Sequence, residues 1–129
     1  MSEIMRYREI EFRAWLEKDK KMITPYAFQL EESNALQVAL AEWRGPFELM
    51  EFTGLLDKTN NKIYECDIVR ATNTKNVGLV QYVPQTASFL VLSIDDGEIY
   101  YEYLNNETCK KYFEVIGNIY ENPKLLKVE

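Results

Sequence analysis

The sequence predicts an all-β protein in which a small barrel or sandwich forms the larger part. Three observations support this prediction: apolar and charged residues alternate near the N-terminus, five short apolar runs follow residue 67, and polar turns separate these runs. The chain has 129 residues, the size of one domain, and 47% of them are hydrophobic, which is enough for one core. We therefore expect a single domain over 1–129, with an N-terminal β layer at 1–45 packed on a barrel at 46–129.

The N-terminal layer begins with a predicted strand at Glu9–Trp15. Ile10, Phe12 and Ala14 alternate with charged residues, and this period of two places the apolar side chains on one buried face. The charged run EKDKKM that follows has no periodicity, so it predicts a turn.

The segment at about 26–41 has two interpretations. Apolar residues alternate on both sides of the polar run EESNA, which predicts a β-hairpin, and we favour this interpretation. The second half also fits a short helix, because apolar residues recur at helical spacing from Leu36 to Trp43. The choice between strand and helix at 35–43 therefore stays open, and Gly45-Pro46 ends the element in either case.

The stretch Phe52–Arg70 consists of an apolar run, a polar turn and a second apolar run. The turn contains Asn60-Asn61, a pair that tolerates positive φ. Asp67 precedes Ile68-Val69, where a short carboxylate accepts hydrogen bonds from nearby backbone N–H groups. Glu65 and Asp67 would alternatively form a working carboxylate pair, but acid–base chemistry needs a cleft and a raised pKa, and the stretch indicates neither. We therefore predict a structural role for Asp67.

Five short strands are predicted in the C-terminal half, each followed by a polar turn. Asp95-Asp96-Gly97 contains the Asp-Gly pair typical of a hairpin, and Gly117 inside the last strand indicates a bulge or a bend. The four polar residues Asn105–Thr108 predict a loop. The predicted strands are Ile68–Thr72, Val77–Val83, Ser88–Ile94, Glu98–Leu104 and Phe113–Tyr120.

The composition excludes several kinds of reactive site. The chain has no histidine, which removes the commonest general base, the commonest metal ligand and every Ser-His or Cys-His pair. Cys66 and Cys109 are too few for a structural zinc site, and in a reducing compartment we expect both to be free thiols. There is no Gly-rich phosphate loop and no nucleophile motif. We therefore predict no catalytic, cofactor-binding or metal-binding residue, and no enzyme.

Hydropathy and charge limit the location and the partners. No apolar run approaches the ~20 residues that a membrane-spanning helix needs, and the charged N-terminus lacks the apolar centre of a signal peptide. We therefore expect a cytoplasmic protein that has no membrane partner. The net charge of −6, from 21 acidic and 15 basic residues, lacks the basic field that duplex DNA requires.

Three stretches of the sequence resemble the YopX family of phage and prophage proteins. They are the opening REIEFRAW, the central FELMEFTGLLDKTNNKIYECDIVR and the closing FEVIGNIYENPKLL, in the family's order along the whole chain. The resemblance implies an SH3-like barrel at about 47–120 and expression in the cytoplasm of a bacterial host. It implies no biochemical activity.

The chain departs from the family pattern at three places. Cys66 occupies the position of a glycine, Asn60-Asn61 replaces asparagine-glycine, and Leu16 stands where aspartate usually follows the tryptophan. The change at position 66 predicts that a positive φ is not obligatory there.

Protein–protein interaction is the first of two non-enzymatic functions that fit these residues. The partner is another protein or a second copy of the chain, because small barrels leave edge strands that recognise other strands. The N-terminal strands are too small to close a core of their own, so their apolar face must cover something. The residues expected on that face are Trp15, Phe28, Leu36, Val38 and Trp43.

The alternative function is single-stranded nucleic-acid binding on the barrel. Tyr101 and Tyr103 share one face of a predicted strand, with Tyr100 on the other, and exposed aromatic rings stack with bases. Acidic residues in the same strand oppose this function. The cations nearest in sequence are Arg70, Lys75, Lys110 and Lys111.

Overall fold

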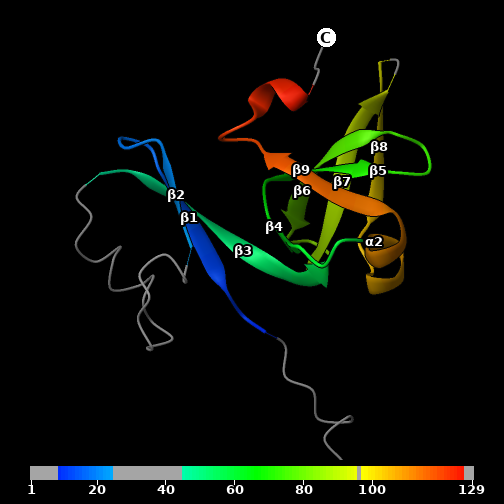
Figure 1. The fold of residues 1–129 in the computed structure, drawn as a ribbon, viewed down its shortest axis with the longest axis horizontal. Coiled ribbons are helices and arrows are strands. Elements are labelled where there is room, and N and C mark those ends of the chain that lie inside the picture. The colour runs from blue at the N-terminus through cyan, green and yellow to red at the C-terminus, as the bar shows by residue number, and fades with distance from the viewer. Residues whose placement is uncertain (1–8, 25–44, 96, 127–129) are drawn as a thin grey trace, which may run out of the picture. The chain divides into compact units, whose positions relative to one another are not determined.

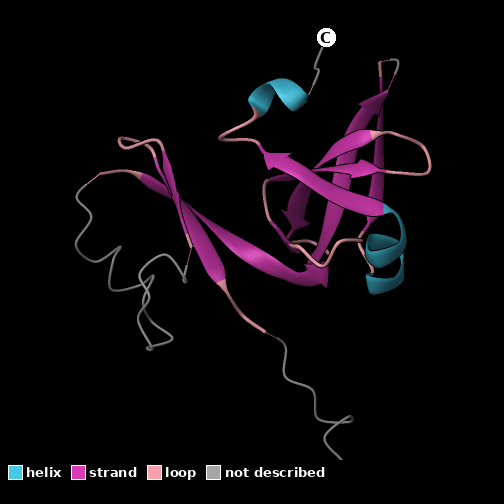
Figure 2. Cartoon of the chain, viewed as in Figure 1, coloured by secondary structure: helices cyan, strands magenta, loops and turns pink. Residues whose placement is uncertain are grey.

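The computed structural model describes residues 9–24, 45–95 and 97–126, and in these residues the protein is all-β apart from two short helices (Figure 1, Figure 2). The predicted fold class is therefore confirmed. The chain divides into two compact units, residues 1–54 and 55–129. The arrangement of both as one domain, with an N-terminal layer packed on a barrel, stays a prediction.

The described residues of the N-terminal unit form three antiparallel strands with β1 in the middle. β1 (Phe12–Leu16) pairs with β2 (Lys21–Ile23) on one side and with β3 (Phe47–Leu56) on the other. The predicted turn after the first strand forms at 17–20, but the last residues of the same charged run form β2, which the sequence pattern does not predict. The predicted hairpin at 26–41 lies outside the described residues. The same is true of 35–43, where the sequence allows either a strand or a helix.

The predicted burial pattern of the first strand is wrong. Ile10 is 65% exposed and lies before the strand, which begins at Phe12, whereas Glu11 and Arg13 are buried. The four consecutive residues from Arg13 to Leu16 are all buried, and consecutive residues of a strand point to opposite faces. Both faces of β1 are therefore covered. The predicted alternation, which leaves one face of the strand exposed to solvent, does not describe this strand. Trp15 is buried as expected, and the other four residues of the predicted apolar face lie outside the described residues.

β3 continues from the first unit into the second. Met50 and Phe52 are buried on the N-terminal side, and Gly54 then adopts a φ of 88°, which L side chains rarely adopt. The last residues of β3 belong to the second unit, where β3 neighbours β4 (Lys62–Tyr64) in the hydrogen-bonded order.

The C-terminal unit contains a curled, five-stranded antiparallel sheet that forms a half-barrel (Figure 1). The strand order is β8-β7-β6-β5-β9, so β8 and β9 form the two edges. All five predicted strands are confirmed, with bounds that differ by at most two residues. The strands are β5 (Asp67–Ala71), β6 (Val77–Val83), β7 (Ser88–Asp95), β8 (Glu98–Tyr103) and β9 (Phe113–Asn118).

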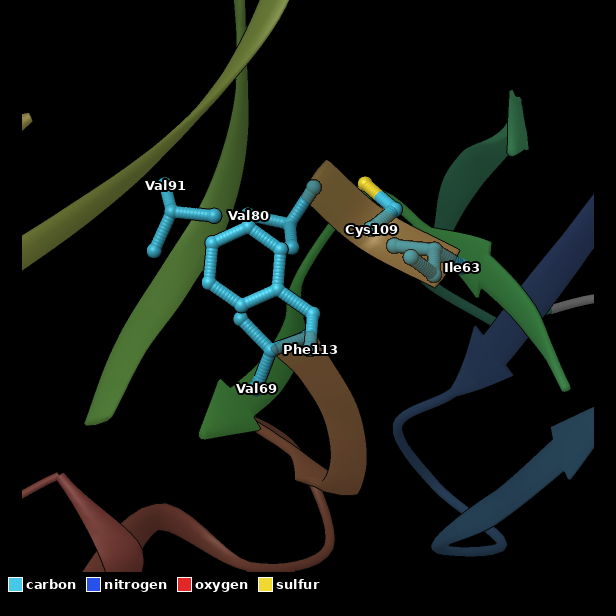
Figure 3. Close-up of a cluster of buried hydrophobic side chains, with 6 residues drawn as sticks. All are labelled: Ile63, Val69, Val80, Val91, Cys109 and Phe113. Atoms are coloured by element: carbon cyan, nitrogen blue, oxygen red, sulfur yellow. The ribbon is translucent and has the colours of Figure 1, made fainter. Parts of the chain in front are cut away.

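One face of this sheet carries the hydrophobic core of the unit. Val80 and Val91 are directly opposite in the register of β6 and β7, so they point to the same face, and the ring of Phe113 lies beside them (Figure 3). Side chains from β4, β5 and the helix complete the cluster. Its buried members are Ile63, Val69, Val80, Val91, Cys109 and Phe113.

The loop predicted at Asn105–Thr108 is wrong, because these residues begin the helix α2 (Asn106–Tyr112). The side chain of Asn105 caps the helix by accepting a hydrogen bond from the N–H of Thr108 at 2.8 Å. An acidic residue in the first turn and two lysines in the last turn complement the helix dipole. A second, 3-10 helix at Pro123–Leu125 follows the last strand.

The bulge predicted near Gly117 is confirmed. Ile68 pairs with Gly117 and the adjacent Val69 pairs with Val115, so Ile116 is the extra residue on β9. A Cβ atom at Gly117 would lie 2.5 Å from the Oδ1 of Asn122, so any larger residue there would displace that side chain.

The expectation that position 66 needs no positive φ is wrong. Cys66 adopts a φ of 71°, in the left-handed region that favours glycine. Its N–H donates to the carbonyl of Val80 at 2.9 Å, and its carbonyl accepts from the N–H of Ile119 at 3.0 Å. These two bonds to distant parts of the unit fix the backbone whatever the side chain. Asn60, in the preceding turn, has a φ of 69°, as its residue type predicts.

We predict that Cys66→Gly stabilises the protein, because glycine adopts a positive φ without the steric cost of a Cβ atom. The gain in the free energy of unfolding should be on the order of 1 kcal/mol, measured by chemical denaturation. Cys66→Ala is the matched control, since it removes the thiol and keeps the Cβ atom. An alanine variant as stable as the glycine variant would show that the backbone conformation is not the cause.

Candidate binding surface

Asp67 has the structural role that the sequence predicts. Its side chain is buried, and its Oδ2 accepts a hydrogen bond from the N–H of Tyr64 at 2.7 Å. Glu65 lies in the turn between β4 and β5, not beside Asp67 on a strand. Neither carboxylate lines the two cavities of the C-terminal unit described below. The structure therefore places Glu65 and Asp67 in different local settings, a turn and the start of a strand, rather than side by side on one strand.

A second buried carboxylate, Asp57, lies at the end of β3 and is not among the residues predicted from the sequence. This residue is 0% exposed. Its Oδ1 accepts from the N–H and the hydroxyl of Thr59, at 2.8 and 3.0 Å, and from the N–H of Asn61 at 2.9 Å. Its Oδ2 accepts from the N–H of Val115 at 2.9 Å. The bonds within the turn have a local signal, an aspartate two residues before a threonine, but the bond to Val115 has none.

The hydrogen bonds of Asp57 determine its charge. Burial alone raises the pKa of this carboxyl group, but the N–H groups of Val115, Asn61 and Thr59 outweigh burial and hold the pKa below its ordinary value. Asp57 is therefore ionised at neutral pH and surrounded by donors. A general acid or base needs a pKa near the working pH, so Asp57 is suited to a structural role.

The turn that contains Asp57 also closes one edge of the five-stranded sheet. The N–H of Val115 in β9 donates to the Asp57 carboxylate, and the carbonyl of Phe113 in β9 accepts from the N–H of Lys58 at 2.9 Å. The turn thus supplies an acceptor and a donor where a neighbouring strand would supply them. Covering an edge in this way prevents it from pairing with another chain.

The two cysteines differ in their surroundings. Both are free in the structure. Cys109 is buried in the core, and burial raises the pKa of its thiol to about 11, so it is protonated at neutral pH. Cys66 is half-buried in its turn. In the described parts of the chain, no three acidic or cysteine side chains lie together in a group that would hold a metal ion.

A cavity of about 290 Å³ lies on the core side of the sheet. Asn73, Thr74 and Ser93 contribute polar groups to its wall, and Tyr100 and Glu102 contribute from β8. Glu102 is the one carboxylate among the lining residues, and no lysine or arginine lines the cavity with it. The lining therefore contains no pair of carboxylates and no carboxylate beside a lysine or arginine.

The opposite side of the sheet carries an exposed apolar surface that ends at β8. Leu79, Leu92 and Tyr101 are directly opposite one another across three strands, so their side chains share this side. A groove of about 500 Å³ lies here, and Leu79, Leu92, Leu125 and Leu126 are among the residues that line it. We call this surface the outer apolar face and define it as Leu79, Leu92, Ile94, Ile99, Tyr101 and Tyr103.

The edge strand β8 is exposed along its whole length. Ile99 is 64% and Tyr101 is 65% exposed. The rings of Tyr101 and Tyr103 meet edge to face, with centroids 6.4 Å apart, so the prediction that these two residues share a face is confirmed. β8 pairs with β7 on one side, and in the described parts of the chain no strand pairs with its other side.

The backbone of β8 presents its hydrogen-bonding groups to the open edge at alternate residues. Leu104 is directly opposite Phe89 in the register with β7, and its N–H donates to the Phe89 carbonyl at 3.0 Å. In an antiparallel pair, such residues alternate with residues whose N–H and carbonyl groups point the other way. Ile99, Tyr101 and Tyr103 therefore direct these groups away from β7.

The cations considered for nucleic-acid binding do not gather beside these tyrosines. Arg70 forms an ion pair with Glu114 at 2.8 Å, and the amino group of Lys111 lies 5.5 Å from the centre of the Tyr112 ring. Lys110 is exposed in the last turn of α2, and Lys75 lines the groove of the outer apolar face. The structure brings together the exposed aromatic residues but not a basic groove.

Comparisons with known proteins concern the fold and the family. A family model described as YopX protein matches residues 11–127. The solved structure titled "Crystal structure of protein EF1440 from Enterococcus faecalis" is similar, with 22% sequence identity, a TM-score of 0.50, and coverage of 94% of this chain and 100% of that chain. At this identity the likeness shows the fold alone. No curated protein matches the sequence.

No helix in the described residues combines the length and the apolar character that crossing a membrane requires.

We predict that Asp57 makes the stability of the protein depend on acidic pH. Because its folded-state pKa is lowered, its stabilisation is complete above the ordinary value of 3.8 and is lost as the pH falls through the folded-state pKa. Asp57→Asn should lower the free energy of unfolding at neutral pH by roughly 1–3 kcal/mol, because the amide group faces N–H donors that it cannot satisfy.

Chemical denaturation at neutral and at acidic pH measures both effects. Asp19→Asn, which changes an exposed aspartate in the turn after β1, is the matched control and should leave both unchanged. An Asp57→Asn variant that loses as much stability on acidification as the wild type would contradict the prediction.

Proposed function

This chain belongs to the YopX family, and on that premise we propose that it is a non-enzymatic phage or prophage protein that binds protein through the edge strand β8. The proposal places it in the cytoplasm of a bacterial host, with an SH3-like barrel as its C-terminal unit and without a cofactor. The observation that carries the proposal is the contrast between the two edges of the five-stranded sheet, one closed by the turn at Asp57 and one open at β8.

The residues of β8 support recognition of another strand. Soluble proteins usually protect an edge strand with charged residues, especially lysine, or with proline or a bulge, and of these β8 carries only the charges of Glu98 and Glu102. The strand EIYYEY contains no lysine or proline, and its register with β7 is continuous. Its odd-numbered residues present backbone groups that a partner strand would complete, and such edge pairing is a common mode of protein recognition.

The side chains beside this edge support protein as the partner. Tyrosine is enriched at protein interfaces because it contributes a large apolar area and a polar tip. The outer apolar face adds two exposed isoleucines and the groove of about 500 Å³, which would receive side chains of a partner. A partner strand at β8 would therefore gain backbone hydrogen bonds and apolar contacts together.

We predict that Ile99→Lys abolishes partner binding, because it places a charge on the outer apolar face at the open edge. Tagged wild type and variant are expressed in the bacterial host together with an untagged copy of the chain, and retained proteins are quantified by mass spectrometry. The wild type should retain a partner, either another protein or the untagged chain, and the variant should lose it.

Ile10→Lys is the matched control for this experiment, because Ile10 is 65% exposed and lies before β1 in the other unit. It should retain the same partner as the wild type. A wild type that retains nothing, not even its own untagged copy, would contradict the proposed function. So would an Ile99→Lys variant that retains the partner in full.

The exposed pair Tyr101 and Tyr103 supports single-stranded nucleic-acid binding as a second candidate function. Two features oppose it. Glu98 and Glu102 belong to the same strand, and Arg70 is held by Glu114. A phosphate backbone beside β8 would therefore meet negative charge rather than a basic groove.

We predict no salt-sensitive complex with a labelled single-stranded or duplex oligonucleotide at physiological salt, measured by fluorescence anisotropy. A tight complex that weakens with salt and disappears in Tyr101→Ala would favour this second function over protein binding.

A further inference from the structure

The open edge of β8 can pair with an identical edge only in a few registers. In an antiparallel pair, residues directly opposite one another point to the same face of the sheet. A two-fold axis perpendicular to the sheet keeps each face of one copy continuous with the same face of the other. Odd- and even-numbered residues of β8 lie on opposite faces, so an odd-numbered residue has to be opposite an odd-numbered residue of the second copy. This condition holds only when the two-fold axis passes beside a residue and not between two residues. Near the middle of the strand, the axis can therefore pass beside Tyr100, Tyr101 or Glu102.

The glutamates of β8 select one of these three registers. With the axis at Tyr100, Glu98 is opposite Glu102 of the second copy, and with the axis at Glu102, that residue is opposite itself. Like charges directly opposite one another destabilise a strand pair. With the axis at Tyr101, Glu102 is opposite Tyr100 and Glu98 is opposite Leu104, so no two glutamates are directly opposite.

The backbone of β8 fits the register centred on Tyr101. In this register Tyr101 is opposite Tyr101 of the second copy, and Ile99 is opposite Tyr103. These are the residues whose N–H and carbonyl groups point away from β7, so each pair exchanges both of its hydrogen bonds.

The side chains of the same pairs lie on the outer apolar face. Exposed aromatic and branched residues then meet directly across the new boundary, which is a favourable cross-strand combination. Backbone and apolar surface are therefore compatible with the register centred on Tyr101, and the glutamate charges select it from the three central registers.

We infer that the partner of β8 is a second copy of this chain, joined by antiparallel β8–β8 pairing with Tyr101 opposite Tyr101 on a two-fold axis. The two half-barrel sheets become one continuous sheet, and each copy removes the open edge of the other. This inference rests on the proposed function, in which β8 is the binding edge, and it names the partner.

Sedimentation velocity of the whole chain over a range of concentrations tests this inference. The wild type should form a dimer whose fraction rises with concentration. Tyr101→Lys and Tyr101→Glu should each raise the dissociation constant at least about a hundredfold, because each places two like charges opposite one another on the axis. Tyr101 is exposed, so both variants should keep the wild-type circular dichroism spectrum and the thermal transition that the wild type shows in dilute solution, where it is monomeric.

An equimolar mixture of the two variants provides the decisive measurement. In the mixture, the lysine of one chain is opposite the glutamate of the other, so a heterodimer should form although each variant alone is monomeric. Formation of this heterodimer requires that residue 101 of one chain is directly opposite residue 101 of the other. A mixture that stays monomeric overturns the inference, as does a dimer that persists in either variant alone.

Tyr100→Lys provides the control for the register. It places a lysine opposite Glu102 of the second copy in the register centred on Tyr101, so the dimer should persist. In the register centred on Tyr100, two lysines would be opposite one another, so loss of the dimer overturns the assigned register.

A wild type that is monomeric at every concentration overturns the inference as well. The proposed function then depends on the capture experiment alone. A different protein that is retained by the wild type and lost in Ile99→Lys would support the function while it excludes self-pairing.

Discussion

The carboxylate of Asp57 is buried and ionised, and its hydrogen bonds come from residues beside it in the turn and from Val115 in the distant strand β9. A buried charge costs several kcal/mol unless hydrogen bonds compensate for the lost water. At Asp57, N–H and hydroxyl donors from the turn and from β9 supply this compensation together. The end of β3, the following turn and β9 therefore have to assemble as one unit. The other strands of the five-stranded sheet then add to β9, whose outer edge the Asp57 turn already covers.

The two edges of the sheet differ because of this constraint. At β9, the carboxylate of Asp57 and the N–H of Lys58 occupy backbone groups that would otherwise face solvent. At β8, the strand is exposed throughout, carries tyrosines and isoleucine, and has no lysine or proline to discourage pairing. In the described residues, this five-stranded sheet therefore has one covered edge and one open edge. Of the three central self-pairing registers, the glutamates oppose one another in two and leave the register centred on Tyr101 free of like-charge pairs, and a pair joined on a two-fold axis at this edge would be closed.

The sequence predicts those features of the fold that have local signals. Alternating residues and tight turns locate the five strands of the C-terminal sheet, and the parity of a strand places Tyr101 and Tyr103 on one face. The bulge at Gly117 follows from a glycine inside a strand. The helix α2 has a cap at Asn105, but its four polar opening residues have the composition of a loop.

The features that the sequence does not predict depend on contacts between distant residues. The positive φ of Cys66 is fixed by bonds to Val80 and Ile119, and the role of Asp57 by its bond to Val115. The burial of Glu11 and Arg13 depends on what covers both faces of β1, which a period of two cannot indicate.

Amide hydrogen exchange, followed for each residue by NMR in dilute and in concentrated solution, tests directly whether one edge is closed by Asp57 and the other is open to a second copy. We predict slow exchange of the Val115 N–H in both solutions, and exchange of the Ile99, Tyr101 and Tyr103 N–H groups that is fast in dilute solution and slow in concentrated solution. Fast exchange at Val115, or exchange at the three β8 residues that does not change with concentration, would contradict this explanation of the fold and its binding edge.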